Sequence, residues 1–140
     1  MLTRDDIAAS LGVGTHASTF GGNPVAAAAA VAVMHVMLSD GFFAQVQERG
    51  QYLAACLAKV ANEFPELATG VRGSGLLLGL VLTEKGVEHG MALVTKLFEE
   101  GVLINFAGNS VLRFIPPLVV EPAEIDLLIE KLRNVLANIS

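Results

Sequence analysis

The sequence has little of what several specialised classes of protein require. Its 140 residues include one cysteine and only 16% charged residues, and they contain no run of lysine or arginine. A single cysteine cannot form an internal disulfide bond, so we expect the chain in a reducing cytoplasm. The net charge of −5 and the missing basic run make nucleic acid and anionic membrane surfaces poor partners.

Long apolar runs and targeting segments are also missing. The apolar stretch from Val25 to Leu38 is shorter than the about 20 residues that a helix needs to cross a bilayer. The first residues, Met1 to Asp6, lack the apolar segment of a signal peptide. Cys56 is expected to be a structural thiol, and His35 a core or interface side chain, because three histidines without a spacing pattern do not indicate a metal site.

Apolar residues are abundant. They make up 53% of the chain, and the mean hydropathy of +0.59 indicates an ordered, core-rich protein of one domain, or one domain and a piece. The low charged fraction indicates that the chain buries surface against something else. The alanine-rich stretch from Val25 to Leu38 is apolar nearly all round, so we expect a helix that is buried on most sides.

Periodicity predicts an α/β fold in which helices and strands follow in mixed order. Residues 1–23 are expected to be extended or loop-like, and a boundary is expected near Ser39. The predicted helices cover 25–38, 42–64, 88–100 and the residues from Pro122 onward. The predicted strands are one buried strand over 71–82 and a hairpin of strands 102–105 and 111–115.

A polar loop precedes the alanine-rich helix. Ser18 and Thr19 carry hydroxyls that can donate to oxyanions, and two glycines follow them. Asn23 is a good N-cap, and Pro24 suits the first helical position. Helix N-termini attract anions, so the loop fits a phosphate site. On these residues a capped helix that binds nothing stays open as the alternative.

Two arginines lie in or beside predicted strands. Arg113 interrupts an apolar strand, where an unpaired guanidinium is costly to bury, so it needs a carboxylate partner or open solvent. Its planar fork fits a carboxylate in a bidentate manner. The alternative is that Arg113 extends into solvent from an edge strand. For Arg72 an ion pair at a strand end is favoured over a functional role.

Two of these segments resemble motifs of the class III pyridoxal-phosphate-dependent aminotransferases. Ser18 to Pro24 resembles a conserved loop of the family, and Val111 to Leu118 resembles its C-terminal motif. Gly101 to Asn105 and Glu124 to Asp126 match as well, and the motifs are closest to those of the acetylornithine enzymes. The resemblance covers essentially the whole chain, but only the C-terminal third of a family member.

The resemblance implies a fold and a set of binding residues. Residues 40–140 would form the C-terminal small domain of a fold-type I transferase, a short, mainly antiparallel sheet with helices packed on one side. Residues 1–39 would end the large cofactor domain. Thr19 matches the hydroxyl residue that binds the phosphate of pyridoxal 5′-phosphate across a homodimer interface, and Ser18 lies beside it. Arg113 matches the arginine that binds the α-carboxylate of the substrate.

The implied reaction moves an amino group between N-acetylornithine, or a similar ω-amino acid, and 2-oxoglutarate in arginine biosynthesis. Its chemistry needs a lysine that forms a Schiff base with the cofactor, and in the family that lysine precedes the segment that resembles Ser18-Thr19. All the lysines here follow that segment: Lys59, Lys85, Lys96 and Lys131. The chain is therefore expected to supply no catalytic residue, and to be inactive by itself.

Two other hypotheses do not require an enzyme. The chain could be a non-catalytic interaction or assembly domain that docks through the alanine-rich helix and binds no cofactor. It could also be a stand-alone anion-binding module at Asn23-Pro24.

Overall fold

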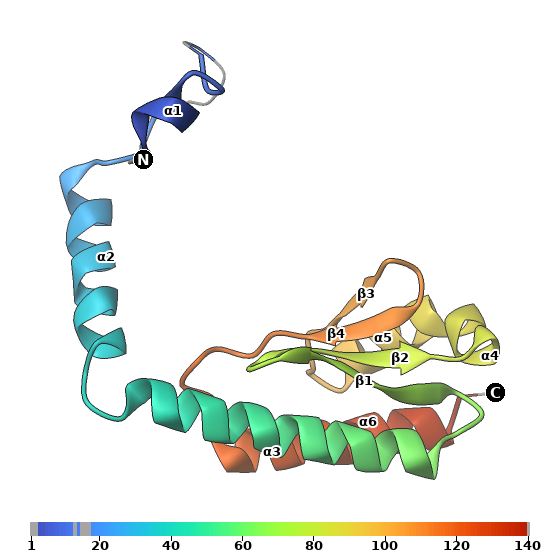
Figure 1. The fold of residues 1–140 in the computed structure, drawn as a ribbon. Helices are drawn as coiled ribbons and strands as arrows, with labels where there is room; N and C mark the ends of the chain where they lie inside the picture. The colour runs from blue at the N-terminus through green and yellow to red at the C-terminus, as the bar shows by residue number, and fades with distance from the viewer. Residues whose placement is uncertain (1–2, 13, 15–17, 140) are drawn as a thin grey trace. The chain divides into compact units, whose positions relative to one another are not determined.

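A computed structural model describes residues 3–12, 14 and 18–139. These form two compact units, Met1–Phe42 and Phe43–Ser140, and each is described by itself. The first unit contains two helices, α1 (Asp5–Ala8) and α2 (Pro24–Met37). Helix α3 (Phe42–Glu63) begins at the last residue of the first unit and otherwise belongs to the second. The second unit also contains β1 (Ala68–Ser74), β2 (Leu77–Leu82), α4 (Glu84–Glu88), α5 (Gly90–Glu99), β3 (Asn105–Ala107), β4 (Val111–Phe114) and α6 (Pro122–Ala137) (Figure 1).

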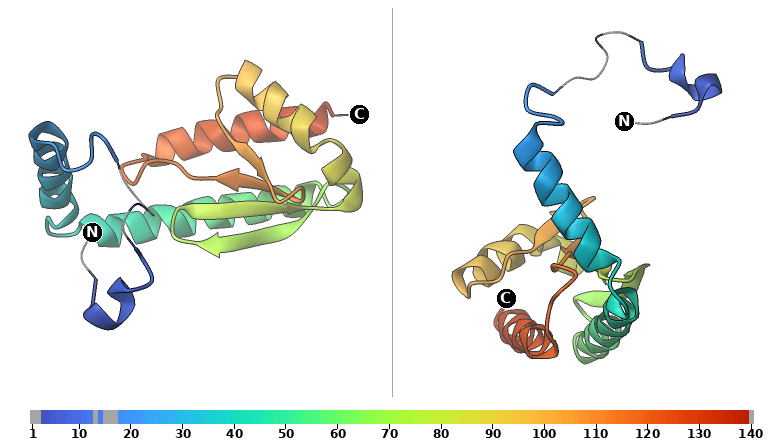
Figure 2. Two further views of the ribbon diagram at one scale, coloured as in Figure 1. Left: turned by 90° about the horizontal axis from the view of Figure 1, so that it is seen from above. Right: turned by 90° about the vertical axis from the view of Figure 1, so that its left-hand side faces the viewer.

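The centre of the second unit is a four-stranded sheet in the order β1-β2-β4-β3. All its strand pairs are antiparallel, which confirms the predicted short antiparallel sheet. Helices α3 and α6 lie side by side along one face of this sheet, and both views in Figure 2 show the same arrangement. Strands β2 and β4 are the inner strands, so both neighbours of each are hydrogen-bonded strands.

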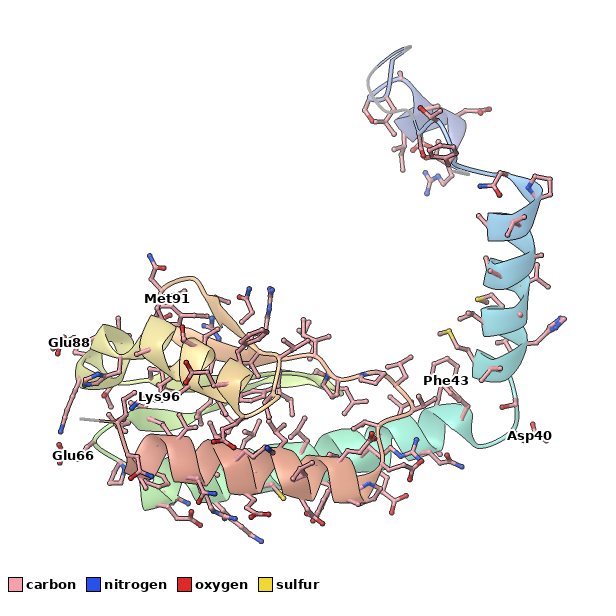
Figure 3. All side chains as sticks on the ribbon, turned by 180° about the vertical axis from the view of Figure 1, so that it is seen from behind. Asp40, Phe43, Glu66, Glu88, Met91 and Lys96 are labelled. Atoms are coloured by element: carbon pink, nitrogen blue, oxygen red, sulfur yellow. The ribbon has the colours of Figure 1, made fainter. Side chains whose placement is uncertain are left out.

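The core lies between the sheet and the helices. Because side chains alternate across a strand, one face of β2 and β4 packs against helices while the other stays open. The described residues include no buried polar side chain, and the fully buried positions are apolar: Leu53, Leu57, Val60, Leu80, Leu93, Leu97, Leu112, Phe114, Ile125, Leu132 and Leu136. Charged side chains lie outside this layer, as Figure 3 shows for Glu66 and Glu88.

The prediction of one buried strand over residues 71–82 is wrong. Those residues belong to the β1–β2 hairpin, in which Ser74 pairs with Leu77 and leaves Gly75-Leu76 as a two-residue turn. Gly75 has a φ of 55°, a left-handed conformation that favours glycine at the first position of such turns. The glycines at this point of the segment therefore mark a reversal of the chain.

The helix predicted over 88–100 is confirmed as α5, and a further short helix that was not predicted, α4, precedes it. The Thr83 hydroxyl caps α4, because it accepts a hydrogen bond from the Gly86 N–H at 3.0 Å. The same hydroxyl donates to the Glu66 carbonyl at 2.6 Å. His89 ends α4, and Gly90 begins α5. A polar side chain with two local partners thus starts a helical turn that apolar periodicity did not indicate.

The other elements agree more closely with the sequence pattern. The predicted helix over 42–64 and the helix from Pro122 are confirmed as α3 and α6. The predicted hairpin is confirmed as β3–β4, although β3 begins only at Asn105. The segment 1–23 includes the short helix α1, which was not predicted. Among the described residues, no single helix combines the length and the hydropathy that a bilayer crossing requires.

Helix α2 forms where predicted, but the structure leaves it exposed. None of its residues is buried, and Val25 is 80% exposed. The expectation that α2 is covered on most sides is therefore not met within the described residues. An apolar helix surface of this kind is typical of a segment that packs against further protein.

Candidate functional site

Arg113 projects from an inner strand on the open face of the sheet. On β4 it lies opposite Gly79 of β2 and opposite Asn105 of β3. Its side chain is exposed and makes no hydrogen bond or ion pair with any residue the structure describes. Because β4 has a neighbour on each side, the edge-strand position in the alternative is wrong, whereas the exposed side chain agrees with its extension into solvent. Arg113 thus meets its requirement for polar surroundings by facing solvent.

A second arginine lies in the same row across the sheet. Arg72 of β1 pairs with Gly79, which in turn pairs with Arg113. Directly opposite residues share a face of an antiparallel sheet, so both guanidinium groups belong to the open face. Arg72 is exposed and forms no ion pair with a described residue, so the expected strand-end ion pair is wrong.

These arginines border a shallow cavity of about 290 Å³ on the open face. Its lining contains no acidic residue and consists of Arg72, Gly73, Leu77, Leu78, Gly79, Ala107, Val111 and Arg113. A Cβ on Gly79 would lie only 2.4 Å from the Cγ1 of Val111, so the glycine makes room for that buried valine. The result is an apolar surface with two cations beside it, which suits a small carboxylic acid.

The Ser18-Thr19 loop belongs to the first unit. Both residues are exposed, and neither hydroxyl is hydrogen-bonded to a described residue. The Gly21 N–H donates to the Ser18 carbonyl at 3.4 Å, which closes a tight turn below the hydroxyls. Free hydroxyl donors are suited to the oxygens of a phosphate group, so the residues present fit the phosphate of pyridoxal 5′-phosphate.

The N-terminus of α2 is less open to an anion than the loop. Pro24 has no N–H, while Ala26 donates to the Asn23 side chain at 3.0 Å and Ala27 to the Asn23 carbonyl at 2.9 Å. Only the Val25 N–H of this first turn has no partner in the described structure. Asn23 thus satisfies most of the N–H groups on which the stand-alone anion-binding hypothesis depends.

The predicted residues fall in different units. Ser18 and Thr19 are in the first unit and Arg113 is in the second, so a common ligand pocket for them stays a prediction. The structure does bring Arg113 together with Arg72, which sequence reasoning did not assign to the site. The only sequence signal was the Gly-x-Gly turn beside Arg72, because that turn folds β1 back onto β2.

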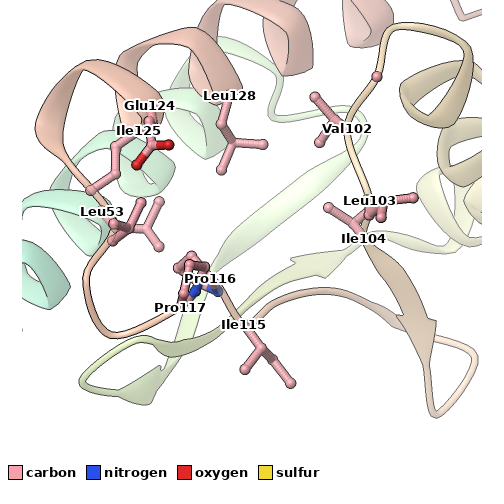
Figure 4. Close-up of a pocket in the computed structure, with 12 residues that line it drawn as sticks. Leu53, Val102, Leu103, Ile104, Ile115, Pro116, Pro117, Glu124, Ile125 and Leu128 are labelled. Carbon is pink, nitrogen blue, oxygen red and sulfur yellow. The ribbon is translucent and has the colours of Figure 1, made fainter. Parts of the chain in front are cut away.

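Another cavity in the second unit has a different character. It has a volume of about 410 Å³ and lies between α6 and the segments that flank the β3–β4 hairpin, as Figure 4 shows. Most of its lining is apolar, for example Leu53, Ile104 and Leu128. Its Glu124 carboxylate accepts a hydrogen bond from the Glu121 N–H at 2.8 Å and so caps α6. In the described part of the chain, no three potential ligands gather around a metal position.

Comparison with known proteins identifies the family. The sequence model of the aminotransferase class III family matches residues 1–136. The chain belongs to the class III aminotransferases. Enzymes of this family depend on pyridoxal phosphate, and the family match includes the loop with Thr19 and the strand with Arg113.

Relatives within the class III family include acetylornithine aminotransferases. The chain is 44% identical to that of Synechocystis sp. over 126 residues, which are 90% of this chain and 29% of the relative. It is 44% identical to acetylornithine aminotransferase 1 of Bradyrhizobium diazoefficiens over 140 residues, which are 100% of this chain and 34% of the relative. The chain therefore spans about a third of the length of these curated relatives.

Solved aminotransferase structures agree with the fold described above. The lysine aminotransferase of M. tuberculosis superposes with a TM-score of 0.78 and 32% identity, over 89% of this chain and 28% of that one. The N-acetylornithine aminotransferase of Stenotrophomonas maltophilia superposes with a TM-score of 0.76 and 33% identity, over 84% of this chain and 32% of that one.

Proposed function

We propose that this chain supplies the C-terminal part of a pyridoxal-phosphate-dependent aminotransferase, which moves an amino group between N-acetylornithine, or a similar ω-amino acid, and 2-oxoglutarate. The observation that carries the proposal is Arg113, an exposed arginine without a carboxylate partner in the described structure, within a strand that matches the family. The acetylornithine relatives at 44% identity support this choice of substrates.

In this proposal Arg113 binds and orients each substrate in turn. Its guanidinium donates two parallel hydrogen bonds to the α-carboxylate. In glutamate this contact fixes the direction of the neighbouring Cα–H bond, and in N-acetylornithine, whose reacting carbon carries the terminal amino group, it orients the rest of the molecule. The cofactor, when bound, supplies the electron sink for the reacting carbon. The Thr19 hydroxyl donates to the cofactor phosphate, with Ser18 beside it, and so holds that end of the site in place.

The lysines of this chain suit structural roles. Lys85 pairs with Glu66 at 3.6 Å and Lys131 with Glu100 at 3.5 Å, while the Lys96 Nζ donates to the Asn138 carbonyl at 3.0 Å. Lys59 is exposed on α3. We propose that the Schiff-base lysine is supplied by a preceding segment like that of the relatives, so that this chain by itself does not catalyse transamination.

The proposal also includes a pathway, a compartment and an oligomeric state. We place the enzyme in arginine biosynthesis in the cytoplasm, and as a homodimer in which Thr19 serves the neighbouring subunit's site. The names of the relatives support acetylornithine as the substrate, and the lone cysteine is consistent with a reducing compartment.

The proposal is tested by co-expressing this chain with the upstream two-thirds of the Synechocystis relative and measuring glutamate formation from N-acetylornithine and 2-oxoglutarate. We expect turnover, and a loss in kcat/KM of about 10- to 100-fold for both substrates in Arg113→Ala, because one charged bidentate contact is removed. Arg113→Lys should retain more activity, while Lys59→Gln, which removes a positive charge far from the sheet face, should leave kcat/KM unchanged.

Two outcomes would contradict this assignment. A well-folded complex without any transamination would reject the aminotransferase proposal. A cofactor affinity that falls as much as substrate affinity in Arg113→Ala would show that Arg113 supports the whole site rather than the substrate carboxylate. The rival assembly-domain function rests on the exposed apolar surface of α2, and it predicts partner binding that is independent of both cofactor and Arg113.

A further inference from the structure

The arginines of this chain differ in whether they have a carboxylate partner. Three are paired: Arg4 with Asp6 at 2.7 Å, Arg49 with Glu121 at 2.9 Å and Arg133 with Glu63 at 2.6 Å. The remaining two, Arg72 and Arg113, are exposed and have no side-chain hydrogen bond or ion pair within the described residues. The two unpaired arginines are also the two that share one row of the sheet.

The strand register fixes the separation between the Cα atoms of these two arginines. One strand, β2, separates β1 from β4, so the two Cα atoms are two strand spacings apart, or about 10 Å. Between them lies Gly79, which adds no side chain to the gap. Long arginine stems from both sides can therefore approach one ligand above the apolar floor that Val111 and Ala107 provide.

The charge pattern selects the kind of ligand. Two guanidinium groups near one another repel, and no acidic side chain lines the cavity to offset them. A monocarboxylate occupies one guanidinium fork and leaves the other unpaired, whereas a dicarboxylate supplies a partner for each. N-acetylornithine has one free carboxylate and 2-oxoglutarate has two, so the second fork concerns only the diacid.

We infer that Arg72 is a specificity-determining residue, which binds the second carboxylate of a dicarboxylic acid while Arg113 binds the first. The inference rests on the proposed function, because it adds a second contact to the carboxylate site assigned to Arg113. It assigns the open face of the sheet to the diacid member of the substrate pair, and it gives Arg72 no role with the monoacid.

The test uses the 140-residue chain and measures affinity directly by NMR titration with glutarate and with butyrate. We expect glutarate to bind about fivefold more tightly than butyrate, since one more exposed ion pair contributes up to about that factor. In Arg72→Gln this preference should disappear while butyrate affinity changes little. Lys59→Gln lowers the net charge by the same amount away from the sheet, and it should preserve the preference.

The outcomes separate this inference from the proposed function. A glutarate preference that persists in Arg72→Gln, or no glutarate preference in the folded parent chain, would overturn the role of Arg72. Arg113→Gln should weaken both ligands, and if it weakens neither, the carboxylate site of the proposed function fails instead. Arg72→Lys keeps the charge without the fork, so a preference between those of the parent and Arg72→Gln supports a direct contact over a structural role.

Discussion

At the scale of single residues, the ionisation of Tyr52 reports on its side-chain contact with Asp126. It is the only tyrosine of a chain without tryptophan. Its hydroxyl donates a hydrogen bond to the Asp126 carboxylate, and this bond raises the pKa of Tyr52 to about 12. A raised pKa means that the contact stabilises the fold fully below the ordinary value of 10.0 and that this stability is lost as the pH rises toward 12.

A spectrophotometric titration of the phenolate absorbance tests this contact. The native chain should ionise with a midpoint near pH 12, and the urea-unfolded chain near 10. Asp126→Ala removes the acceptor, so the native midpoint should fall toward 10.0, whereas Glu130→Ala on the exposed side of the same helix should not move it. A native midpoint equal to the unfolded one would show that the hydrogen bond does not persist in solution.

The site residues show what sequence alone can and cannot supply. Thr19 and Arg113 were named from local motifs, because each motif gives a residue type together with its chain neighbours. Arg72 was expected to form an ion pair at a strand end instead, because its place beside Arg113 depends on two strand registers. Those registers depend on the reversal at Gly75, and without that turn nothing in the sequence places residue 72 opposite residue 79.

At the scale of elements, α3 and α6 are joined by exposed polar contacts beside their apolar faces. The Arg133 guanidinium donates two hydrogen bonds to the Glu63 carboxylate, at 2.6 and 2.7 Å. These bonds hold the pKa of Glu63 below its ordinary value of 4.5. Because the carboxylate form is favoured in the fold, the contact stabilises the chain above that pH and is lost as the pH falls below it.

Acid unfolding measures this helix-to-helix contact. We expect Glu63→Gln to lower Tm slightly at neutral pH, since exposed pairs contribute little, and to make Tm less dependent on pH below about 4.5. Glu130→Gln, on a described residue without an ion pair, is the matched control and should retain the steeper fall in Tm. Identical acid profiles for the two variants would contradict a stabilising Glu63–Arg133 pair.

The elements also differ in how much of them the sequence determined. Helices α3 and α6 were predicted from apolar periodicity, since one face of each packs on the sheet. Helix α4 was missed because its start depends on a cap at Thr83 rather than on apolar spacing. Hydrogen bonds of one side chain thus begin a helical turn ahead of the helix that the hydrophobic pattern predicted.

At the scale of the whole molecule, the two units differ in how they use apolar residues. The second unit buries its apolar side chains in one core, while α2 of the first exposes Val31, Val33 and Val36 by 54%, 56% and 55%. Low charge together with an exposed apolar helix favours association. About two-thirds of the length of the relatives has no counterpart in these 140 residues.

We therefore expect the 140-residue chain by itself to self-associate through α2. Val33 and Val36 lie three positions apart, on one side of the helix. Glutamate has a higher helix propensity than valine, so the double variant Val33→Glu with Val36→Glu should keep α2 helical. The added negative charges should make that side of the helix repel a second copy. Sedimentation velocity should then show a monomer in place of larger species. The pair Gln47→Glu and Gln51→Glu adds the same charge to exposed positions of α3 and should leave association intact. The prediction fails if the parent chain is monomeric, or if both double variants associate equally. Either result would mean that the exposed valines of α2 do not hold copies together. It would also remove the support that the assembly-domain function draws from this helix.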